Sequence, residues 1–179
     1  MRIISGKHRS RIIKMVDVET TRETTDKVRG AIFNLLSFYQ IKGVCLDLFS
    51  GSGAMGLEAL SRGCEKAYFN DLGKKAYNIT KDNCKALGYQ KEVVITNLDY
   101  KKALAFYKEP FDFVFLDPPY KLDCCNEIIN YIEENNLLKE DGVIVCEVDK
   151  DTLINETNNL IIYKEKEYGI RKVYILKFR

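Results

Sequence analysis

The chain of 179 residues has a single histidine, His8, and no two of its six cysteines show Cys-x-x-Cys spacing. Zinc sites usually combine such cysteine pairs with histidines, so the sequence gives little support for any metal site. The cysteines are Cys45, Cys64, Cys84, Cys124, Cys125 and Cys146. Several of them stand in apolar stretches, so we expect small buried hydrophobic side chains that stay reduced in a cytosol.

Long apolar runs are also missing. No run approaches the roughly 18 residues that a membrane-spanning helix needs. The opening segment, Met1 to Gly6, lacks the long apolar region of a signal peptide. We therefore expect a cytoplasmic protein without a membrane partner. With 46% hydrophobic and 30% charged residues, the composition suits one globular domain that spans residues 1–179.

The net charge of +2 is unevenly distributed along the chain. Five cations and no acid precede Asp17, and these cations are Arg2, Lys7, Arg9, Arg11 and Lys14. This segment carries +5, which leaves −3 for the remainder. A basic arm on a mildly acidic body is typical of a protein that docks a polyanion at one end, although a solvated, solubilising tail has the same composition.

Apolar periodicity predicts alternating strands and helices after a short N-terminal hairpin within residues 1–20, where Ile3-Ile4 and Ile12-Ile13 flank a basic turn. A first helix is expected from Thr24-Thr25-Asp26 to Leu36. The predicted strands are 44–48, 67–70, 93–96, 111–116 and 143–148. The predicted helices between them are 54–62, 74–87, 102–107 and 124–135.

This alternation predicts an α/β fold, in which a parallel sheet carries helices on both faces. The end of the chain differs, because strand-like runs at 160–168 and 171–178 are separated only by Gly169-Ile170. No crossover helix fits there, so the two runs must form an antiparallel hairpin at one side of the sheet. We therefore expect seven strands, most of them parallel.

A glycine-rich turn, Asp47-Leu-Phe-Ser-Gly-Ser-Gly53, follows the first predicted strand, and with Gly56 it fits the pattern G-x-G-x-x-G. Glycines there allow a tight turn and a close approach of the backbone to a ligand. Ligands of open α/β sheets bind beyond the carboxyl ends of the strands. Asp71 ends the second strand, where an acid can accept ribose hydroxyls, and Asp99 follows the third, where it could meet an adenine amino group. Both acids could instead be ordinary strand-end caps.

Two nucleoside cofactors compete for this arrangement. A dinucleotide would place its pyrophosphate on the helix N-terminus, whose partial positive charge favours anions. S-adenosylmethionine has no phosphate and carries a sulfonium cation, which suits Asp47 beside the loop better than a pyrophosphate does. The closing hairpin and the motif at residues 117–120 also favour the methyl donor.

The tetrapeptide Asp117-Pro118-Pro119-Tyr120 closes the very apolar strand 111–116. The prolines keep Asp117 and Pro118 extended. The Asp117 carboxylate and the Pro118 carbonyl can together accept both hydrogens of an exocyclic amine, while Tyr120 offers a flat face to a base. The alternative, a rigid turn with a core tyrosine, is weaker beside the glycine-rich turn. The two motifs predict a site that presents a planar amine to a nucleoside cofactor.

Four segments resemble one known family, the bacterial RsmD family, whose members methylate N2 of a guanine in 16S ribosomal RNA with S-adenosylmethionine. These segments are Met1–Lys7, Arg22–Leu36, Asp47–Gly63 and Asp117–Tyr120. The resemblance runs from Met1 to the hairpin at Gly169 and implies a Rossmann-like class I methyltransferase. Two positions depart from the family pattern, with Glu23 in place of a usual proline and Asp71 in place of a usual glutamate. Neither departure removes a required chemical group.

The resemblance also implies roles for individual residues. The methionine end of the cofactor would be surrounded by Asp47, Ser50, Gly51 and Gly53, and Phe49 would also contact the cofactor. Asp71 would hold the ribose, Leu98 and Asp99 would border the adenine, and Thr24 and Thr25 would close over the amino acid end. RNA phosphates would be gripped by Arg2, Lys7, Arg9 and Arg11. Catalysis would fall to Asp117, Pro118 and Tyr120, with Pro119 and Tyr120 against the target base.

The implied partner is 16S ribosomal RNA, within a 30S subunit or an assembly intermediate, and nothing in the sequence demands more than a monomer. A DNA adenine or cytosine amino-methyltransferase is a rival, but such enzymes usually carry a target-recognition domain for which this chain has no length. A cytosine C5 methyltransferase needs a cysteine nucleophile, and the chain has no Pro-Cys dipeptide. The remaining alternative is a non-catalytic RNA-binding assembly factor. The intact Asp117 and glycine-rich turn argue against it.

Overall fold

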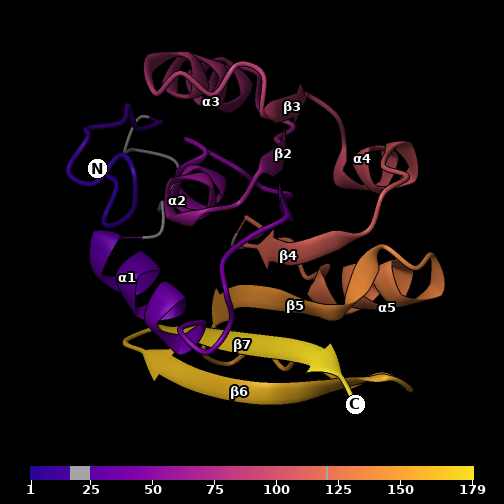
Figure 1. The fold of residues 1–179 in the computed structure, drawn as a ribbon. Helices are drawn as coiled ribbons and strands as arrows, with labels where there is room; N and C mark the ends of the chain where they lie inside the picture. Colours follow the sequence, from indigo (N-terminus) through magenta and orange to yellow (C-terminus); the bar gives the residue numbers. More distant parts are fainter. Residues whose placement is uncertain (17–24, 120) are drawn as a thin grey trace.

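The computed structural model describes residues 1–16, 25–119 and 121–179. Within these residues, seven strands form one sheet in the order β3-β2-β1-β4-β5-β7-β6 (Figure 1). The strands are β1 (Val44–Asp47), β2 (Lys66–Asn70), β3 (Val93–Thr96), β4 (Phe111–Leu116), β5 (Leu138–Asp149), β6 (Leu160–Tyr168) and β7 (Arg171–Phe178). Neighbours among β1 to β5 pair in parallel, whereas β7 is antiparallel to both β5 and β6. The predicted mostly parallel sheet with a terminal hairpin is confirmed.

Five helices of the described chain cover the two faces of the sheet, with α1 to α3 on one face and α4 and α5 on the other (Figure 1). They are α1 (Asp26–Leu35), α2 (Ala54–Arg62), α3 (Lys74–Ala86), α4 (Tyr100–Phe106) and α5 (Cys125–Glu134). Successive strand residues point to opposite faces. Phe113 and Phe115 of β4 therefore pack in the cluster under α1 to α3, whereas Val114 and Leu116 pack in the cluster under α4 and α5. Burial on both faces explains why β4 is continuously apolar.

Two elements begin at least two residues earlier than the apolar periodicity predicted. β5 starts at Leu138, ahead of residue 143, because Leu138 pairs with Phe111 across a register shift. The polar residues 139–141 separate Leu138 from residue 143, so the apolar pattern does not indicate the first part of the strand. α4 starts at Tyr100, because the Asp99 carboxylate caps it by accepting a backbone N–H of its first turn at 3.0 Å.

The N-terminal arm, residues 1–16, folds back as a turn closed by one antiparallel bridge between Arg2 and Ile12. The backbone N–H groups of Ile3 and Ile13 donate across this turn at 2.9 and 3.1 Å. Ile3 and Ile13 are buried in the core, so they anchor the arm on the face of the sheet that carries α1 to α3. The expected hairpin is thus present as a turn with a single bridge.

A buried carboxylate clamps the arm onto α2. Glu58 is 0% exposed and accepts the backbone N–H groups of Ile4 at 2.8 Å and Ser5 at 3.0 Å. Gly6 then passes so close to α2 that a Cβ on it would lie 1.8 Å from the Ser61 carbonyl oxygen, and its φ of +82° also favours glycine. α2 is therefore covered by the sheet on one side and by the arm on the other.

Candidate cofactor and amine site

The strand order changes direction between β1 and β4: β2 and β3 follow on one side, and β5 follows on the other. Ligands of open α/β sheets bind at such a switch point. Asp47 of β1 pairs with Phe115 of β4, so the loop after Asp47 and the loop that begins at Asp117 leave the sheet side by side. The fold thereby brings together the two motifs that the sequence singled out.

Backbone conformations that favour glycine shape the loop after β1. Gly51 has a φ of +54° and Gly53 a φ of +82°, a region that other L-residues rarely enter. The Gly53 N–H donates to the Ser50 carbonyl at 2.6 Å and closes the turn. Gly56 serves packing instead, because a Cβ there would lie 2.3 Å from the ring of Phe69. The absence of a side chain lets α2 pack directly on β2.

Asp47 discriminates between the two cofactors. It is 4% exposed, and its carboxylate accepts the N–H of Gly56 at 3.0 Å. This N–H belongs to the first turn of α2, whose donors a pyrophosphate would use. Because the protein's own carboxylate is already bound there, the loop disfavours a phosphate and suits a ligand with positive charge, which fits S-adenosylmethionine.

Two further acids stand at the carboxyl ends of β2 and β3. Asp71 accepts the N–H of Gly51 at 2.9 Å and that of Gly73 at 2.8 Å, so it also holds the glycine-rich loop in place. Asp99 caps α4. Both acids therefore make the strand-end contacts that the sequence left open as an alternative, and these contacts hold both carboxylates at the ligand edge of the sheet.

Apolar side chains line the same edge on the side of α4. Phe49 and Leu98 are half-buried and pack against the cluster under α4 and α5. The ring of Phe49 lies 5.8 Å from that of Tyr100, measured between centroids. Leu72, directly after Asp71, is 70% exposed and adds an apolar group at this edge that no sequence motif indicated.

A buried asparagine joins three strand ends. Asn70 is 1% exposed, and its Nδ2 donates to the Leu98 carbonyl at 3.0 Å and, at 3.4 Å, to the Leu48 carbonyl. Its Oδ1 accepts the Leu98 N–H at 3.2 Å and the Thr96 hydroxyl at 2.8 Å, and its carbonyl accepts the Ser50 N–H at 2.8 Å. Asn70 thus ties together the loops after β1, β2 and β3. In the sequence it was only the last residue of a predicted strand.

The Asp117 carboxylate, at the end of β4, meets a cation from the end of the chain. Arg171 Nη2 lies 2.6 Å from Asp117 Oδ1, and the same guanidinium lies 2.9 Å from an Asp149 oxygen and 3.2 Å from a Glu147 oxygen. Burial acts to lower the pKa of Arg171, but the Asp117 and Glu147 carboxylates raise it above its ordinary value. No motif indicated this cluster.

The two prolines of the amine motif differ in exposure. Pro118 is buried and Pro119 is exposed. The carbonyl oxygen of Pro119 accepts the N–H of Leu122 at 2.8 Å. Tyr120 lies outside the described residues, so the expected stacking face stays a prediction.

Two threonines were expected over the amino acid end of the cofactor, and one of them, Thr25, is among the described residues. Thr25 caps α1, with its hydroxyl oxygen accepting the Val28 N–H at 3.3 Å. Thr24 and residues 17–20 of the expected N-terminal extension lie outside the described residues.

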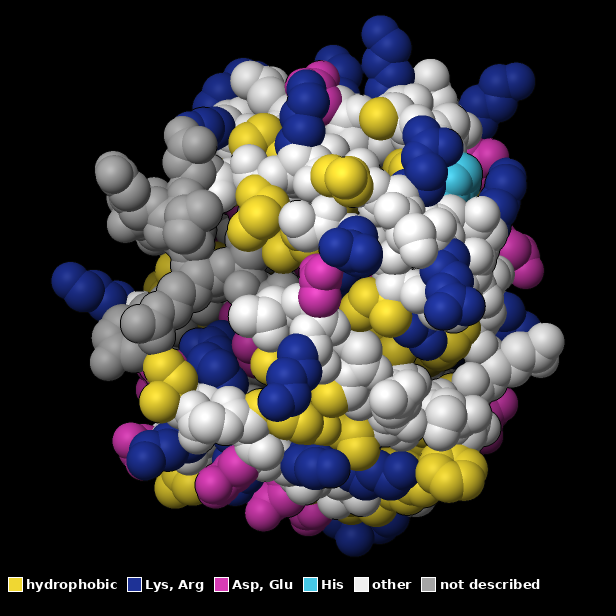
Figure 2. Space-filling view, turned by 90° about the vertical axis from the view of Figure 1, so that its left-hand side faces the viewer, with side chains coloured by type: hydrophobic (Ala, Val, Ile, Leu, Met, Phe, Trp, Pro, Cys, Tyr) yellow, Lys and Arg dark blue, Asp and Glu magenta, His cyan; other side chains and the backbone are white. Residues whose placement is uncertain are grey.

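The predicted RNA contacts of the arm all have exposed side chains: Arg2, Lys7, Arg9 and Arg11. The arm also packs on α3, where the Lys14 N–H donates to Asn83 Oδ1 at 2.8 Å and Arg11 Nη2 donates to the Ala86 carbonyl at 3.2 Å. α3 adds exposed cations that the sequence reading did not single out, namely Lys74, Lys75, Lys81 and Lys85. Figure 2 views this side of the molecule and shows Lys and Arg side chains along its upper rim.

Comparison with known proteins identifies the family of the chain. The family model described as Conserved hypothetical protein 95 matches residues 1–177. Ribosomal RNA small subunit methyltransferase D of Haemophilus influenzae is 38% identical over 95% of this chain and 90% of that protein. The protein of the same name from Escherichia coli K12 is 34% identical over 94% of this chain and 85% of that protein. The chain belongs to the RsmD family.

Solved structures agree with the RsmD-family assignment. A candidate methyltransferase from Escherichia coli matches with a TM-score of 0.89 at 30% identity, over 100% of this chain and 98% of that one. A candidate methylase from Haemophilus influenzae matches with a TM-score of 0.79 at 35% identity, over 99% and 97%. The predicted class I methyltransferase fold is confirmed, and the cofactor of this RsmD-family chain is S-adenosylmethionine.

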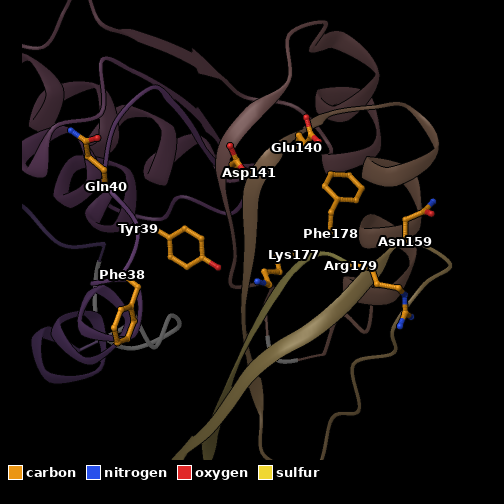
Figure 3. Close-up of a pocket in the computed structure, with 9 residues that line it drawn as sticks. All are labelled: Phe38, Tyr39, Gln40, Glu140, Asp141, Asn159, Lys177, Phe178 and Arg179. Atoms are coloured by element: carbon orange, nitrogen blue, oxygen red, sulfur yellow. The ribbon is translucent and has the colours of Figure 1, made fainter.

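One surface hollow of this RsmD-family chain lies away from both motifs. It encloses about 710 Å³ between the segment after α1, the start of β5 and the end of β7, and Tyr39, Asp141 and Lys177 are among the residues that line it (Figure 3). Because β7 is antiparallel, its end lies at the edge opposite the carboxyl ends of β1 and β4. The hollow contains none of the motif residues, so the motif edge remains the candidate site.

The remaining side chains of the RsmD-family chain with reactive potential are possible metal ligands and thiols. Within residues 1–16, 25–119 and 121–179, no group of three or more His, Cys, Asp or Glu side chains could hold a metal ion. In the same residues no helix combines the length and apolarity that crossing a membrane requires. The six cysteines are buried and free of disulfides, and burial raises the pKa of both Cys84 and Cys124 to about 12.

Proposed function

We propose that this chain transfers a methyl group from S-adenosylmethionine to the N2 amine of a guanine in 16S ribosomal RNA. The observation that carries the proposal is the meeting of the glycine-rich loop and the Asp117 motif at one switch point of the sheet. Relatives named Ribosomal RNA small subunit methyltransferase D, aligned over most of this chain, support ribosomal RNA as the substrate.

The acceptor amine is oriented by two oxygens of the motif. The lone pair of the guanine N2 is delocalised into the ring, so the amine is a poor nucleophile and gains most from being held in line with the methyl group. Asp117 and the Pro118 carbonyl accept its two hydrogens. The Leu122 N–H already uses the Pro119 oxygen, which favours Pro118 as the second acceptor.

Bound S-adenosylmethionine supplies a methyl group on a positively charged sulfur. The N–C bond forms as the S–C bond breaks, and the amine then loses one proton. Asp117 stabilises the positive charge that develops on nitrogen during this step. Tyr120 is proposed to hold the base after it leaves its stack, which costs least in RNA loops.

The arm is proposed to hold the RNA backbone. Its exposed cations and the lysines of α3 share one side of the molecule and can neutralise phosphates along a strand (Figure 2). Because Glu58 and Ser61 of α2 bind its backbone, the arm is proposed to act as a fixed part of one domain that spans residues 1–179.

Tritiated S-adenosylmethionine tests the proposal with three acceptors: undermethylated 30S subunits, naked 16S RNA and duplex DNA. Nuclease digestion then identifies the labelled nucleoside. N2-methylguanosine from 30S subunits or 16S RNA is the expected result, and it also tells which form is the substrate. Label only in DNA would favour a DNA amino-methyltransferase. Cofactor binding without label in any acceptor would favour a non-catalytic assembly factor.

The double variant R9A/R11A tests the RNA surface. Loss of two phosphate contacts should weaken RNA binding about tenfold or more near physiological salt and lower the slope of log affinity against log salt by about one per contact. Cofactor affinity should not change. The matched control K102A/K108A removes two exposed cations of the α4 region, on the opposite side of the fold from the arm (Figure 1). An equal loss in both variants would argue against a localised RNA site.

A further inference from the structure

One guanidinium binds three carboxylates beside the amine motif. Arg171 contacts Asp117 at 2.6 Å, Asp149 at 2.9 Å and Glu147 at 3.2 Å, and its Nη2 also donates to the Glu147 carbonyl at 3.3 Å. The side chains of Arg171 and Asp117 are 21% and 25% exposed, so water screens this pair only in part. Such a short contact at a partly buried site fixes the orientation of the Asp117 carboxylate.

The sheet explains how Arg171 reaches the motif. Arg171 is the first residue of β7, opposite Asp149 of β5, and Glu147 pairs with Val173 two residues further along. The Lys150 N–H donates to the Ile170 carbonyl at 3.0 Å, which holds the turn before β7 against the end of β5. β5 lies between β7 and β4. The guanidinium is therefore anchored on β5 and extends over its end to Asp117 on the far side.

We infer that Arg171 is a positioning residue for methyl transfer: it holds the Asp117 carboxylate in place and keeps it ionised while the amine binds. This inference rests on the proposed function. Without the guanidinium, Asp117 would stand near two other acids, and like charges favour the protonated form of a carboxyl group. A protonated Asp117 would be a poorer acceptor for the amine hydrogens and would stabilise less charge on nitrogen.

The contact with Arg171 also indicates which part of the reaction Asp117 serves. A carboxylate held by a guanidinium binds a proton weakly, so Asp117 serves to orient the amine and to stabilise its charge. The proton that the amine loses passes to solvent, and no further reactant is needed for the step to balance.

Three variants test the inference in the same assay as the wild type. R171Q removes the charge, and R171K keeps the charge but loses the planar fork that binds several carboxylates at once. K172Q is the control, because Lys172 is the next residue and instead pairs with Glu165 of β6 at 3.3 Å. Measurements are kcat and KM on 30S subunits from about pH 5 to about pH 9 and cofactor affinity by calorimetry.

R171Q should lower kcat about 10- to 100-fold at neutral pH and move the acid limb of the kcat profile to higher pH, with cofactor affinity nearly unchanged. R171K should restore part of kcat and most of the pH profile, and K172Q should match the wild type. An R171Q enzyme with the wild-type rate and profile would overturn the inference. A faster R171Q enzyme would also overturn it, because Arg171 would then compete with the amine for Asp117.

A second readout does not depend on activity. The carboxyl carbon of Asp117 can be followed by ¹³C NMR in aspartate-labelled protein, with the resonance assigned through D117N. We expect its titration midpoint to lie at higher pH in R171Q than in the wild type and in R171K. Equal midpoints would overturn the inference even if the wild type methylates RNA. If the wild type methylates none of the acceptors, the proposed function fails, and the NMR comparison still decides whether Arg171 keeps Asp117 ionised.

Discussion

The two halves of the candidate site are held by different kinds of interaction. The cofactor half, at the ends of β1, β2 and β3, depends on glycine conformations at Gly51 and Gly53, on hydrogen bonds of the Asn70 side chain, and on the Asp47 and Asp71 carboxylates that accept backbone N–H groups. The amine half, at the end of β4, depends on the ion pair between Asp117 and Arg171. The cofactor half is thus held by backbone conformation and by side-chain hydrogen bonds to the backbone, whereas the amine half is held by two oppositely charged side chains from different parts of the sheet. The comparison therefore predicts that the two halves can be disrupted separately.

D117A should show the largest effect, because it removes the amine half alone. Methyl transfer should fall about a thousandfold or more in kcat, since the variant lacks both the hydrogen acceptor and the negative charge beside the reacting nitrogen. Cofactor affinity, measured by calorimetry, should stay nearly constant. D123A, at an exposed position shortly after the motif, is the control. Normal turnover by D117A would remove this residue from the mechanism.

D71A should disturb the cofactor half instead. Asp71 holds the N–H groups of Gly51 and Gly73, so the variant loses the expected ribose contact and releases the glycine-rich loop. Loss of a charged hydrogen-bonding group of this kind should weaken cofactor binding about 10- to 100-fold. At saturating cofactor, kcat should recover most of its wild-type value. A loss in kcat that saturation does not restore would contradict the separation of the two halves.

Two glycine variants test whether the cofactor half needs close backbone packing at Gly56. G56A places a Cβ 2.3 Å from the Phe69 ring, so overpacking should lower the free energy of unfolding by about 1 to 3 kcal/mol. G30A, also within a helix, meets only Ile4 Cδ1 at 3.5 Å and should raise stability by up to about 1 kcal/mol, because alanine favours helices. Denaturant unfolding measures both. Equal effects would mean that close packing at Gly56 is not needed.

C124S should show the smallest effect. Burial favours the neutral thiol and raises the pKa of Cys124 to about 12, so this thiol stays protonated at neutral pH and is a poor nucleophile. We expect kcat within about twofold of the wild type. Thiol reagents should react slowly with the native protein and rapidly with all six cysteines once it is unfolded. A large loss of kcat in C124S would revive a cysteine-dependent mechanism.

Local patterns predicted most of the fold. The alternation of apolar segments indicated the strands and helices, and a polar stretch hid the start of β5 before residue 143. The hairpin was predictable because Gly169-Ile170 leaves room only for a tight turn. The N-terminal turn was indicated by its isoleucines, but its clamp was not, since Glu58 looks in the sequence like an ordinary surface acid of a helix. Its burial became visible only where the arm covers α2.

Some features of the candidate site were likewise predictable from the sequence, and others became visible only in the structure. The sequence by itself determined the glycine-rich loop, the Asp117 motif and the family, because each lies in a short contiguous segment with a characteristic pattern. Only the tertiary structure decided that Asn70 joins three loops and that Arg171 holds Asp117. Both sets of contacts depend on strand order: β2 lies between β1 and β3, which places Asn70 beside the loops after them, and β7 pairs with β5 in the antiparallel direction, which brings the start of β7 to the edge where β4 ends. A charge pair between residues far apart in the chain leaves no local pattern, since it forms only when the sheet brings its members together.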